Sequence, residues 1–249
     1  MVSSAAVAVI LVITVVAALA ADPPAPCRST LIPAYVPAGG LARLANDAEP
    51  GRSVILNPAS GPGAAEQADY RQATAAAQKA GTKVLGYVPT GYGARDPATV
   101  RADVERYRTW YGVDGIFLDE TAHDEAHLAY YQALTRDMRA AGIKTIAINP
   151  GVVPTPGYFG LADVVVTYEG PYAGYAAAQR ATPAWVRDQP RERIAHLVYG
   201  ATGKQAEAVV KADAYAGHVY VTDGVLPHPW GSLPPYLQDE ERSLATCGE

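Results

Sequence analysis

The sequence is poor in charged residues and has no cluster of lysine and arginine. Charged residues make up 18% of the 249-residue chain, against roughly 25% in typical soluble domains. The formal net charge is −5. A mildly acidic chain without a basic patch is a poor match for nucleic acids or anionic membrane surfaces. We therefore expect neither as a partner.

Several motifs of known chemistry are also absent. No G-x-S-x-G elbow is present, which argues against serine-type hydrolysis. The glycine-rich segments 57–63 and 90–93 lack the lysine of a phosphate-binding loop and the G-x-G-x-x-G spacing. We interpret them as tight turns that bring the backbone close to a ligand. His123 and His127 stand four residues apart, but Asp124 occupies the place where a zincin needs glutamate. We expect no metal at this pair.

Cysteine is scarce, with Cys27 and Cys247 near the two ends of the chain. In an exported protein such a pair is expected to be oxidised. We predict a disulfide between them that ties together the first and last segments, with two unrelated thiols as the alternative. Closing so long a loop contributes up to ~4–5 kcal/mol in the chain-entropy model.

The N-terminal region carries the long apolar run, residues 5–21, which is broken only by Thr14. Ala18-Leu19-Ala20 fits the small-x-small pattern of a signal peptidase site, although a positive n-region is missing. Residues 1–21 are therefore predicted to be a cleaved signal peptide or an uncut anchor. Residues 22–29 are predicted to be a linker segment and residues 30–249 the catalytic domain. We expect a secreted or cell-surface monomer that contacts a membrane only through an uncut N-terminal segment.

The rest of the chain alternates short apolar runs with alanine-rich runs. Strands are predicted at residues 30–36, 53–57, 83–88, 115–119, 144–149, 163–168, 193–199 and 218–222. Helices are predicted at residues 64–80, 97–111, 124–141 and 204–215. Near-continuous apolar strands are typical of a parallel sheet. Eight of them alternating with helices predict an α/β fold, either a single (β/α)8 TIM-type barrel or a doubly wound sheet, and the strand count favours the barrel.

Local signals support the predicted helix boundaries. Gly81 and Gly142 follow two of the predicted helices at the position where a positive φ is needed. Pro97 opens another helix in its first turn, where its missing N–H costs nothing.

The ends of the predicted strands are polar although their bodies are apolar. Candidate binding residues at or just after these ends are Tyr35, Asn57, Tyr87, Tyr92, Asn149, Tyr168, Tyr199 and Asp223. In a (β/α)8 barrel the strand ends converge on one face, where active sites lie. Tyrosine, with 16 copies against 2 of phenylalanine, offers a stacking face and a hydroxyl. This lining suits a polyhydroxylated ligand. Trp230, in a rigid proline-flanked loop, is either a stacking platform over the same face or a core residue.

Three carboxylates carry the chemistry that we predict: Asp119 and Glu120 end the fourth strand and Glu169 ends the sixth. Glycosidic cleavage needs one proton donor and one nucleophile or base. We predict Glu169 as the donor and Asp119 as the nucleophile or stabilising base, with Glu120 interchangeable with Asp119. Adjacent strand residues point opposite ways, so only one of Asp119 and Glu120 should face the pocket unless the turn of the chain at the strand end brings both to it. The alternative is that Asp119 caps the following helix and Glu169 pairs with an arginine.

The sequence resembles the spherulin-4 family over nearly all of its length. The resemblance is carried, in order, by IPAYVPAGG from Ile32, VILNPASGPG from Val54, GYVPTGYGAR from Gly86, WYGVDGIFLDE from Trp110, NPG from Asn149, DVVVTYEG from Asp163 and PPY from Pro234. It implies a cofactor-free (β/α)8 barrel with its acids in FLDE and YEG. It also implies endo-α-1,4-N-acetylgalactosaminidase activity on a galactosamine-containing exopolysaccharide such as galactosaminogalactan, a biofilm polymer.

One departure from the family pattern affects the expected specificity. The family tends to have Asn-Pro-Tyr after the eighth strand, where this chain has His228-Pro229-Trp230, so the sugar at that subsite stays open. The competing hypothesis for the whole chain is a non-catalytic polysaccharide-binding or cell-surface structural protein on the same barrel.

Overall fold

The computed structural model describes residues 28–47, 49–212 and 215–246. Eight parallel strands follow one another around a barrel in chain order. They are β1 (Leu31–Ala34), β2 (Ser53–Leu56), β3 (Lys83–Pro89), β4 (Gly115–Asp119), β5 (Thr145–Ile148), β6 (Val164–Pro171), β7 (Ile194–Tyr199) and β8 (His218–Val221). A parallel bridge between Ser29 and His218 brings the start of the sheet to β8 and closes the ring. The predicted (β/α)8 barrel is confirmed.

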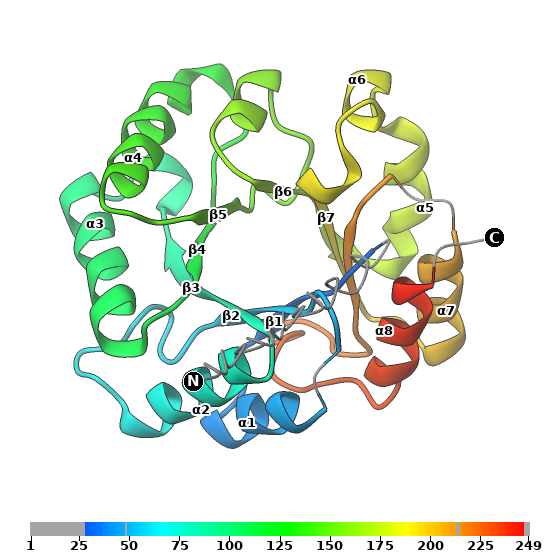
Figure 1. Ribbon diagram of the computed structural model, residues 1–249. Coiled ribbons are helices and arrows are strands. Elements are labelled where there is room, and N and C mark those ends of the chain that lie inside the picture. The colour runs from blue at the N-terminus through cyan, green and yellow to red at the C-terminus, as the bar shows by residue number, and fades with distance from the viewer. Residues whose placement is uncertain (1–27, 48, 213–214, 247–249) are drawn as a thin grey trace, which may run out of the picture.

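Helices surround the strands, as Figure 1 shows. They are α1 (Ala38–Asn46), α2 (Ala68–Lys79), α3 (Pro97–Arg106), α4 (Leu128–Ala140), α5 (Tyr172–Ala181), α6 (Ala184–Arg187), α7 (Gly203–Lys211) and α8 (Leu237–Ala245). The four predicted helices correspond to α2, α3, α4 and α7. Gly81 and Gly142 adopt φ of 90° and 89° just past α2 and α4, as predicted. Pro97 opens α3 behind Asp96, which caps it by accepting from the Thr99 N–H.

The sequence did not reveal α1, α5, α6 and α8. The α1 segment contains two glycines, so local propensity argues against helix there. The α5 segment is alanine-rich, so its own residues favour helix and it could have been predicted from them. Burial of Leu41 and Leu44 against the barrel explains why α1 forms nevertheless. Within the described residues, β5 and β6 are joined without an α-helix, through the 3-10 turn Pro156–Gly160.

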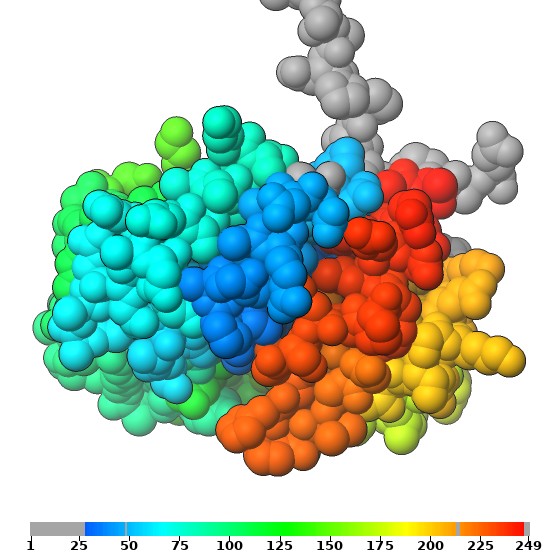
Figure 2. All heavy atoms as spheres, turned by 90° about the horizontal axis from the view of Figure 1, so that it is seen from below, coloured from blue at the N-terminus to red at the C-terminus, as the bar shows by residue number. Residues whose placement is uncertain are grey.

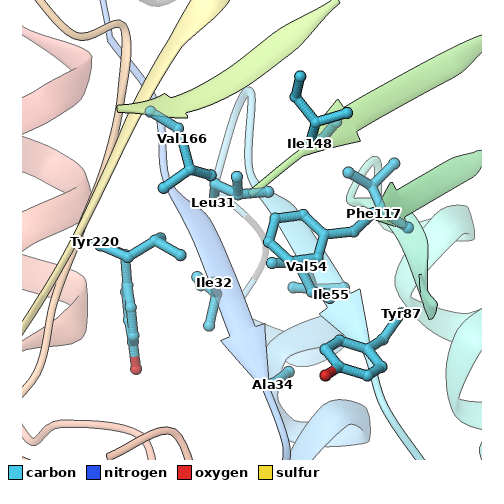
Figure 3. Close-up of a cluster of buried hydrophobic side chains, with 14 of the residues drawn as sticks. Leu31, Ile32, Ala34, Val54, Ile55, Tyr87, Phe117, Ile148, Val166 and Tyr220 are labelled. Atoms are coloured by element: carbon cyan, nitrogen blue, oxygen red, sulfur yellow. The ribbon is translucent and has the colours of Figure 1, made fainter. Parts of the chain in front are cut away.

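Apolar side chains from the strands pack together in the barrel. Figure 3 shows Leu31, Val54, Phe117 and Ile148 from four strands in one cluster, and each is at most 2% exposed. Side chains of this size fill the barrel interior rather than leaving a pore. A ligand can therefore be received only at an end of the barrel or outside it.

The first and last described segments lie side by side. The Arg28 N–H donates to the Leu244 carbonyl at 3.2 Å, and Figure 2 shows the blue early residues next to the red α8. Cys27, Cys247 and the apolar run 5–21 lie outside the described residues, so the disulfide and the signal peptide stay predictions. No helix of the described residues is long and apolar enough to cross a membrane.

Candidate functional site

A cavity of about 650 Å³ opens at the carboxyl ends of the strands. We call it the mouth cavity. Ten of the predicted site residues line it: Tyr35, Asn57, Tyr87, Tyr92, Asp119, Glu120, Asn149, Glu169, Tyr199 and Trp230. They come from positions 35 to 230 of the chain and meet because parallel barrel strands all end on the same face.

Two predicted residues, Tyr168 and Asp223, do not line the mouth cavity. Tyr168 precedes Glu169 on β6, and adjacent strand residues point to opposite sides. With Glu169 inside, Tyr168 faces outward, where its ring packs edge-on against Tyr175 at 5.1 Å between centroids. Asp223 follows β8 and is exposed to solvent.

Asn149 holds two of the three carboxylates together. Its side-chain nitrogen donates to Asp119 Oδ1 at 2.8 Å and also to Glu169 Oε2. Its side-chain oxygen accepts from the Gly151 N–H at 3.0 Å, which fixes the amide so that its nitrogen faces the acids. Because one nitrogen bonds both carboxylates, their nearest oxygens lie no more than roughly 6 Å apart.

The third carboxylate, Glu120, reaches the mouth cavity through an unusual backbone conformation. Its φ is 49°, in the left-handed region that residues with a side chain rarely adopt. This conformation breaks the strand alternation, so that Asp119 and Glu120 both line the cavity. The Glu120 carboxylate accepts from the Gly91 N–H at 3.2 Å. Strain of this kind is frequent at functional sites.

The other two non-glycine residues with positive φ among the described residues also line the mouth cavity. Ser60 has φ of 51° and Tyr92 has φ of 54°. Both belong to the glycine-rich segments, whose Gly61, Gly63, Gly91 and Gly93 likewise have positive φ. The prediction that these segments form tight turns is confirmed.

The electrostatics of the two bridged carboxylates differ. Burial, and then the neighbouring charge of Asp119, raise the pKa of Glu169 to about 7. Burial also raises the pKa of Asp119, but hydrogen bonds from Tyr87 and Asn149 favour its charged form and oppose this rise. Because the pKa of Glu169 lies close to neutral pH while hydrogen bonds favour the charged form of Asp119, Glu169 is the better candidate of the two to carry a proton.

Trp230 is part of the wall of the mouth cavity. Its side chain is 7% exposed, its ring stands edge-on to Tyr199 at 6.0 Å, and its side chain hydrogen-bonds Glu169. Trp230 is thus packed and also lines the mouth cavity, and its role as a stacking platform stays a prediction.

The alternative roles for the acids do not match their contacts. The 3-10 turn after β4 is capped by Asp124, which accepts from the His127 N–H at 3.1 Å, and not by Asp119. Glu169 is contacted by Asn149 and Trp230, and not by an arginine. Among the described residues, no group of three or more metal-ligating side chains is close enough to hold a metal ion.

Several lining residues were not among the individually predicted site residues, although segment 57–63 and the loop His228-Pro229-Trp230 were expected near the ligand. The residues not individually predicted are Ser60, Pro150, Gly151, Leu226, Pro227, His228, Pro229 and Gly231. Most belong to the loop after β8. The prolines of this loop indicated that it is rigid, but its path over the mouth cavity depends on packing against β7 and β8. The NPG string at Asn149 was a signal for Pro150 and Gly151.

A carboxylate- and tyrosine-lined mouth on a (β/α)8 barrel is typical of proteins that act on carbohydrates. Comparison with known proteins agrees with this class. Residues 42–242 match the model of the spherulation-specific family 4, and the chain belongs to this family.

Individual relatives support the assignment. Spherulin-4 of Physarum polycephalum is 28% identical over 232 residues, covering 86% of this chain and 69% of that protein. The crystal structure of Aspergillus clavatus Sph3 in complex with GalNAc superposes with a TM-score of 0.75 at 25% identity, covering 89% of this chain and 98% of that one. A maltogenic alpha-amylase, AmyB of Thermotoga neapolitana, shares the fold alone, with a TM-score of 0.52 at 10% identity over 87% of this chain and 75% of that one.

Proposed function

We propose that this protein is a glycoside hydrolase that cleaves α-1,4-linked N-acetylgalactosamine or galactosamine units in an exopolysaccharide. The observation that carries the proposal is the pair of carboxylates, Asp119 and Glu169, held on the single amide nitrogen of Asn149. The likeness to Sph3, which was solved with GalNAc, supports the choice of sugar.

Glu169 is the proton donor in this proposal. Its pKa of about 7 leaves a large protonated fraction near neutral pH, as a general acid requires. Asp119, whose carboxylate receives hydrogen bonds from Tyr87 and Asn149, is the nucleophile. Glu120 adds negative charge beside the reacting carbon, where positive charge develops in an oxocarbenium-like transition state.

The close approach of the two carboxylates favours retention of configuration. Retaining glycosidases hold their carboxyl groups about 5–5.5 Å apart and inverting ones about 6.5–9.5 Å. The shared Asn149 nitrogen limits the distance between the nearest oxygens of Asp119 and Glu169 to roughly 6 Å, and this supports the choice of the shorter range. In the first step Glu169 protonates the leaving oxygen as Asp119 bonds to the anomeric carbon. In the second, Glu169 takes a proton from water, which displaces Asp119.

The test is a reducing-end assay on galactosaminogalactan with wild-type protein and the variants Glu169→Gln and Asp119→Asn. Wild type is expected to release reducing ends, and each variant to lose at least about 1000-fold in kcat. Asp223→Asn is the matched control, because Asp223 is an acid near the same face that lies outside the mouth cavity. NMR of the first-formed anomer then tests retention.

Equal activity of wild type and Glu169→Gln would remove Glu169 from the mechanism. Polymer binding without any cleavage would instead favour the non-catalytic polysaccharide-binding protein. We place the activity outside the cell, because the apolar run 5–21 has the character of an export signal or anchor. Detection of the mature chain in culture supernatant or on the cell surface tests this part.

A further inference from the structure

A second cavity lies on the outer side of β6. Its volume is about 730 Å³, and we call it the outer cavity. Three aromatic and three polar side chains characterise its lining: Thr167, Tyr168, Gln179, Thr182, Trp185 and Tyr215. In the described chain no α-helix connects β5 to β6. The outer cavity lies where such a helix would otherwise cover the outer face of β6.

The aromatic rings of the outer cavity are held in place. Tyr168 donates its hydroxyl to the Pro171 carbonyl at 2.7 Å. Trp185 stands edge-on to Phe159 with 5.5 Å between centroids, and the Tyr215 hydroxyl bonds the Thr182 hydroxyl at 2.7 Å. All three residues are half-buried. A ligand that stacks on fixed rings loses little to the ordering of side chains.

The outer cavity adjoins the mouth cavity. Gly151 and Glu169 line both, and the Glu169 N–H donates to the Gly151 carbonyl at 2.9 Å. The wall between the two cavities thus consists of β6 and the loop after β5, which is hydrogen-bonded to it. Glu169 faces the mouth cavity from this wall, and the neighbouring Tyr168 faces the outer cavity.

The lining has the chemistry of a sugar site. It combines aromatic rings with hydroxyl, amide and carboxylate groups, the carboxylate being that of Asp124. The Arg187 guanidinium lies over one face of the Tyr215 ring at 5.7 Å. The described residues that line it include no lysine or arginine, which makes an anionic ligand a poor match. Thr155 Oγ1, in a residue of the same lining, is buried without a hydrogen-bond partner among the described residues. A buried polar atom of this kind calls for a partner.

We infer that the outer cavity is a carbohydrate-binding site for a further stretch of the polymer whose scissile bond lies in the mouth cavity. The inference rests on the proposed function, since it takes the same polymer as ligand. The outer cavity selects long chains over short ones, because only a long chain reaches across the wall at Gly151 and occupies both cavities at once.

The experiment measures binding in an inactive background, so that cleavage does not enter. The parent is Asp119→Asn, because Asp119 lines only the mouth cavity. Trp185→Ala is added to it, and the dissociation constants of galactosaminogalactan and of an α-1,4-linked GalNAc tetrasaccharide are measured by calorimetry. We expect the constant for the polymer to rise about tenfold and the constant for the tetrasaccharide to change much less.

Two further variants make the result decisive. Trp110→Ala removes another half-buried tryptophan that lines neither cavity and lies under the Arg106 guanidinium, and it is expected to leave polymer binding unchanged. Ala181→Met, on an exposed lining position of α5, narrows the outer cavity without removing a packed ring. It is expected to weaken polymer binding even if Trp185→Ala does not fold.

The outcomes separate this inference from the proposed function. If wild type cleaves the polymer but folded Trp185→Ala and Ala181→Met bind it as tightly as the parent, the outer site is wrong and the hydrolase stands. If wild type does not cleave but polymer binding depends on Trp185, the outer site stands and the hydrolase is wrong. No binding by the parent overturns both. Self-association of the parent that Trp185→Ala abolishes, with polymer binding unchanged, would assign the outer cavity to a second copy of the chain.

Discussion

At the scale of single residues, Asn149 decides how the carboxylates act together. It is only 6% exposed, and both polar atoms of its side chain are hydrogen-bonded. The oxygen is held by the Gly151 N–H, and the nitrogen serves Asp119 and Glu169. In the proposed mechanism Asn149 is a positioning residue, because it acts through the two acids.

Removing this amide is expected to slow the reaction and to shift its pH dependence. Asn149→Ala should lower kcat by roughly 100-fold, as loss of one preorganised donor does in other active sites. Because the hydrogen bond from Asn149 lowers the pKa of Glu169, the alkaline limb of the kcat profile should also move to higher pH. A purely structural role would leave that limb in place. Rate measurements between pH 5 and 9 distinguish the two.

The raised pKa of Glu169 also predicts a stability effect. The pKa is about 7 in the folded chain against 4.5 for an ordinary glutamate, so the folded state binds more protons between these values. Stability should therefore fall as the pH rises through this window. Glu169→Gln should stabilise the protein by about 1–3 kcal/mol at pH 8 and by much less at pH 4. Urea denaturation at both pH values measures this, and an equal change at the two would contradict it.

At the scale of elements, a hydrogen-bonded chain joins the loops after β3 and β4 and fixes Glu120. The Ala122 N–H donates to the Tyr131 hydroxyl at 3.0 Å, and that hydroxyl meets the Thr90 hydroxyl at 2.8 Å. The Thr90 hydroxyl in turn donates to the Glu120 carbonyl at 2.7 Å. Helix α4, which carries Tyr131, thus supports the left-handed conformation of Glu120.

Breaking this series of hydrogen bonds should make the conformation of Glu120 less well fixed, although neither Thr90 nor Tyr131 lines the mouth cavity. Thr90→Val keeps the shape of the side chain but leaves buried polar groups unpaired, at a cost of about 1–3 kcal/mol. We expect Thr90→Val to lower the thermal stability and to lower kcat several-fold. Tyr131→Phe, which removes another hydroxyl of the same series of hydrogen bonds, should change both quantities in the same direction. Thermal denaturation and kinetic assays measure both effects. Wild-type behaviour of both variants would contradict the proposal that Thr90 and Tyr131 support Glu120.

At the scale of the whole molecule, a buried ion pair lies at the end of the barrel opposite to the proposed active site. Arg52, just before β2, pairs with Glu241 of α8 through two hydrogen bonds of 2.6 and 2.5 Å. The two side chains are 1% and 3% exposed. Thr30 also donates to Glu241 at 3.0 Å, and Arg52 donates to the Leu44 carbonyl at 2.6 Å. One ion pair therefore joins the last helix to β2, α1 and the segment before β1.

Removing one partner of this pair should destabilise the fold and leave the chemistry intact. Arg52→Leu leaves the Glu241 carboxylate buried without its counter-charge, which typically costs about 3–5 kcal/mol. The double variant Arg52→Leu/Glu241→Leu should recover most of the loss, because no buried charge is then left unpaired. Both should keep wild-type kcat at temperatures where they are folded. Denaturation curves measure the loss of stability and its recovery in the double variant. A lower kcat in folded protein would contradict the expectation that the chemistry is unaffected.

The sequence by itself determined the barrel, because eight buried strands must be apolar throughout and their polar ends must then gather on one face. It also brought the acids of the fourth and sixth strands to that face, but left Asp119 and Glu120 interchangeable as the partner of Glu169. Only the tertiary structure decided the direction of Tyr168, the left-handed turn at Glu120 and the bridging by Asn149. These depend on strand alternation and on contacts between residues tens of positions apart. The same holds for α1, which forms because the barrel buries Leu41 and Leu44 and not because its own residues favour helix, whereas the alanine-rich α5 segment favours helix by itself.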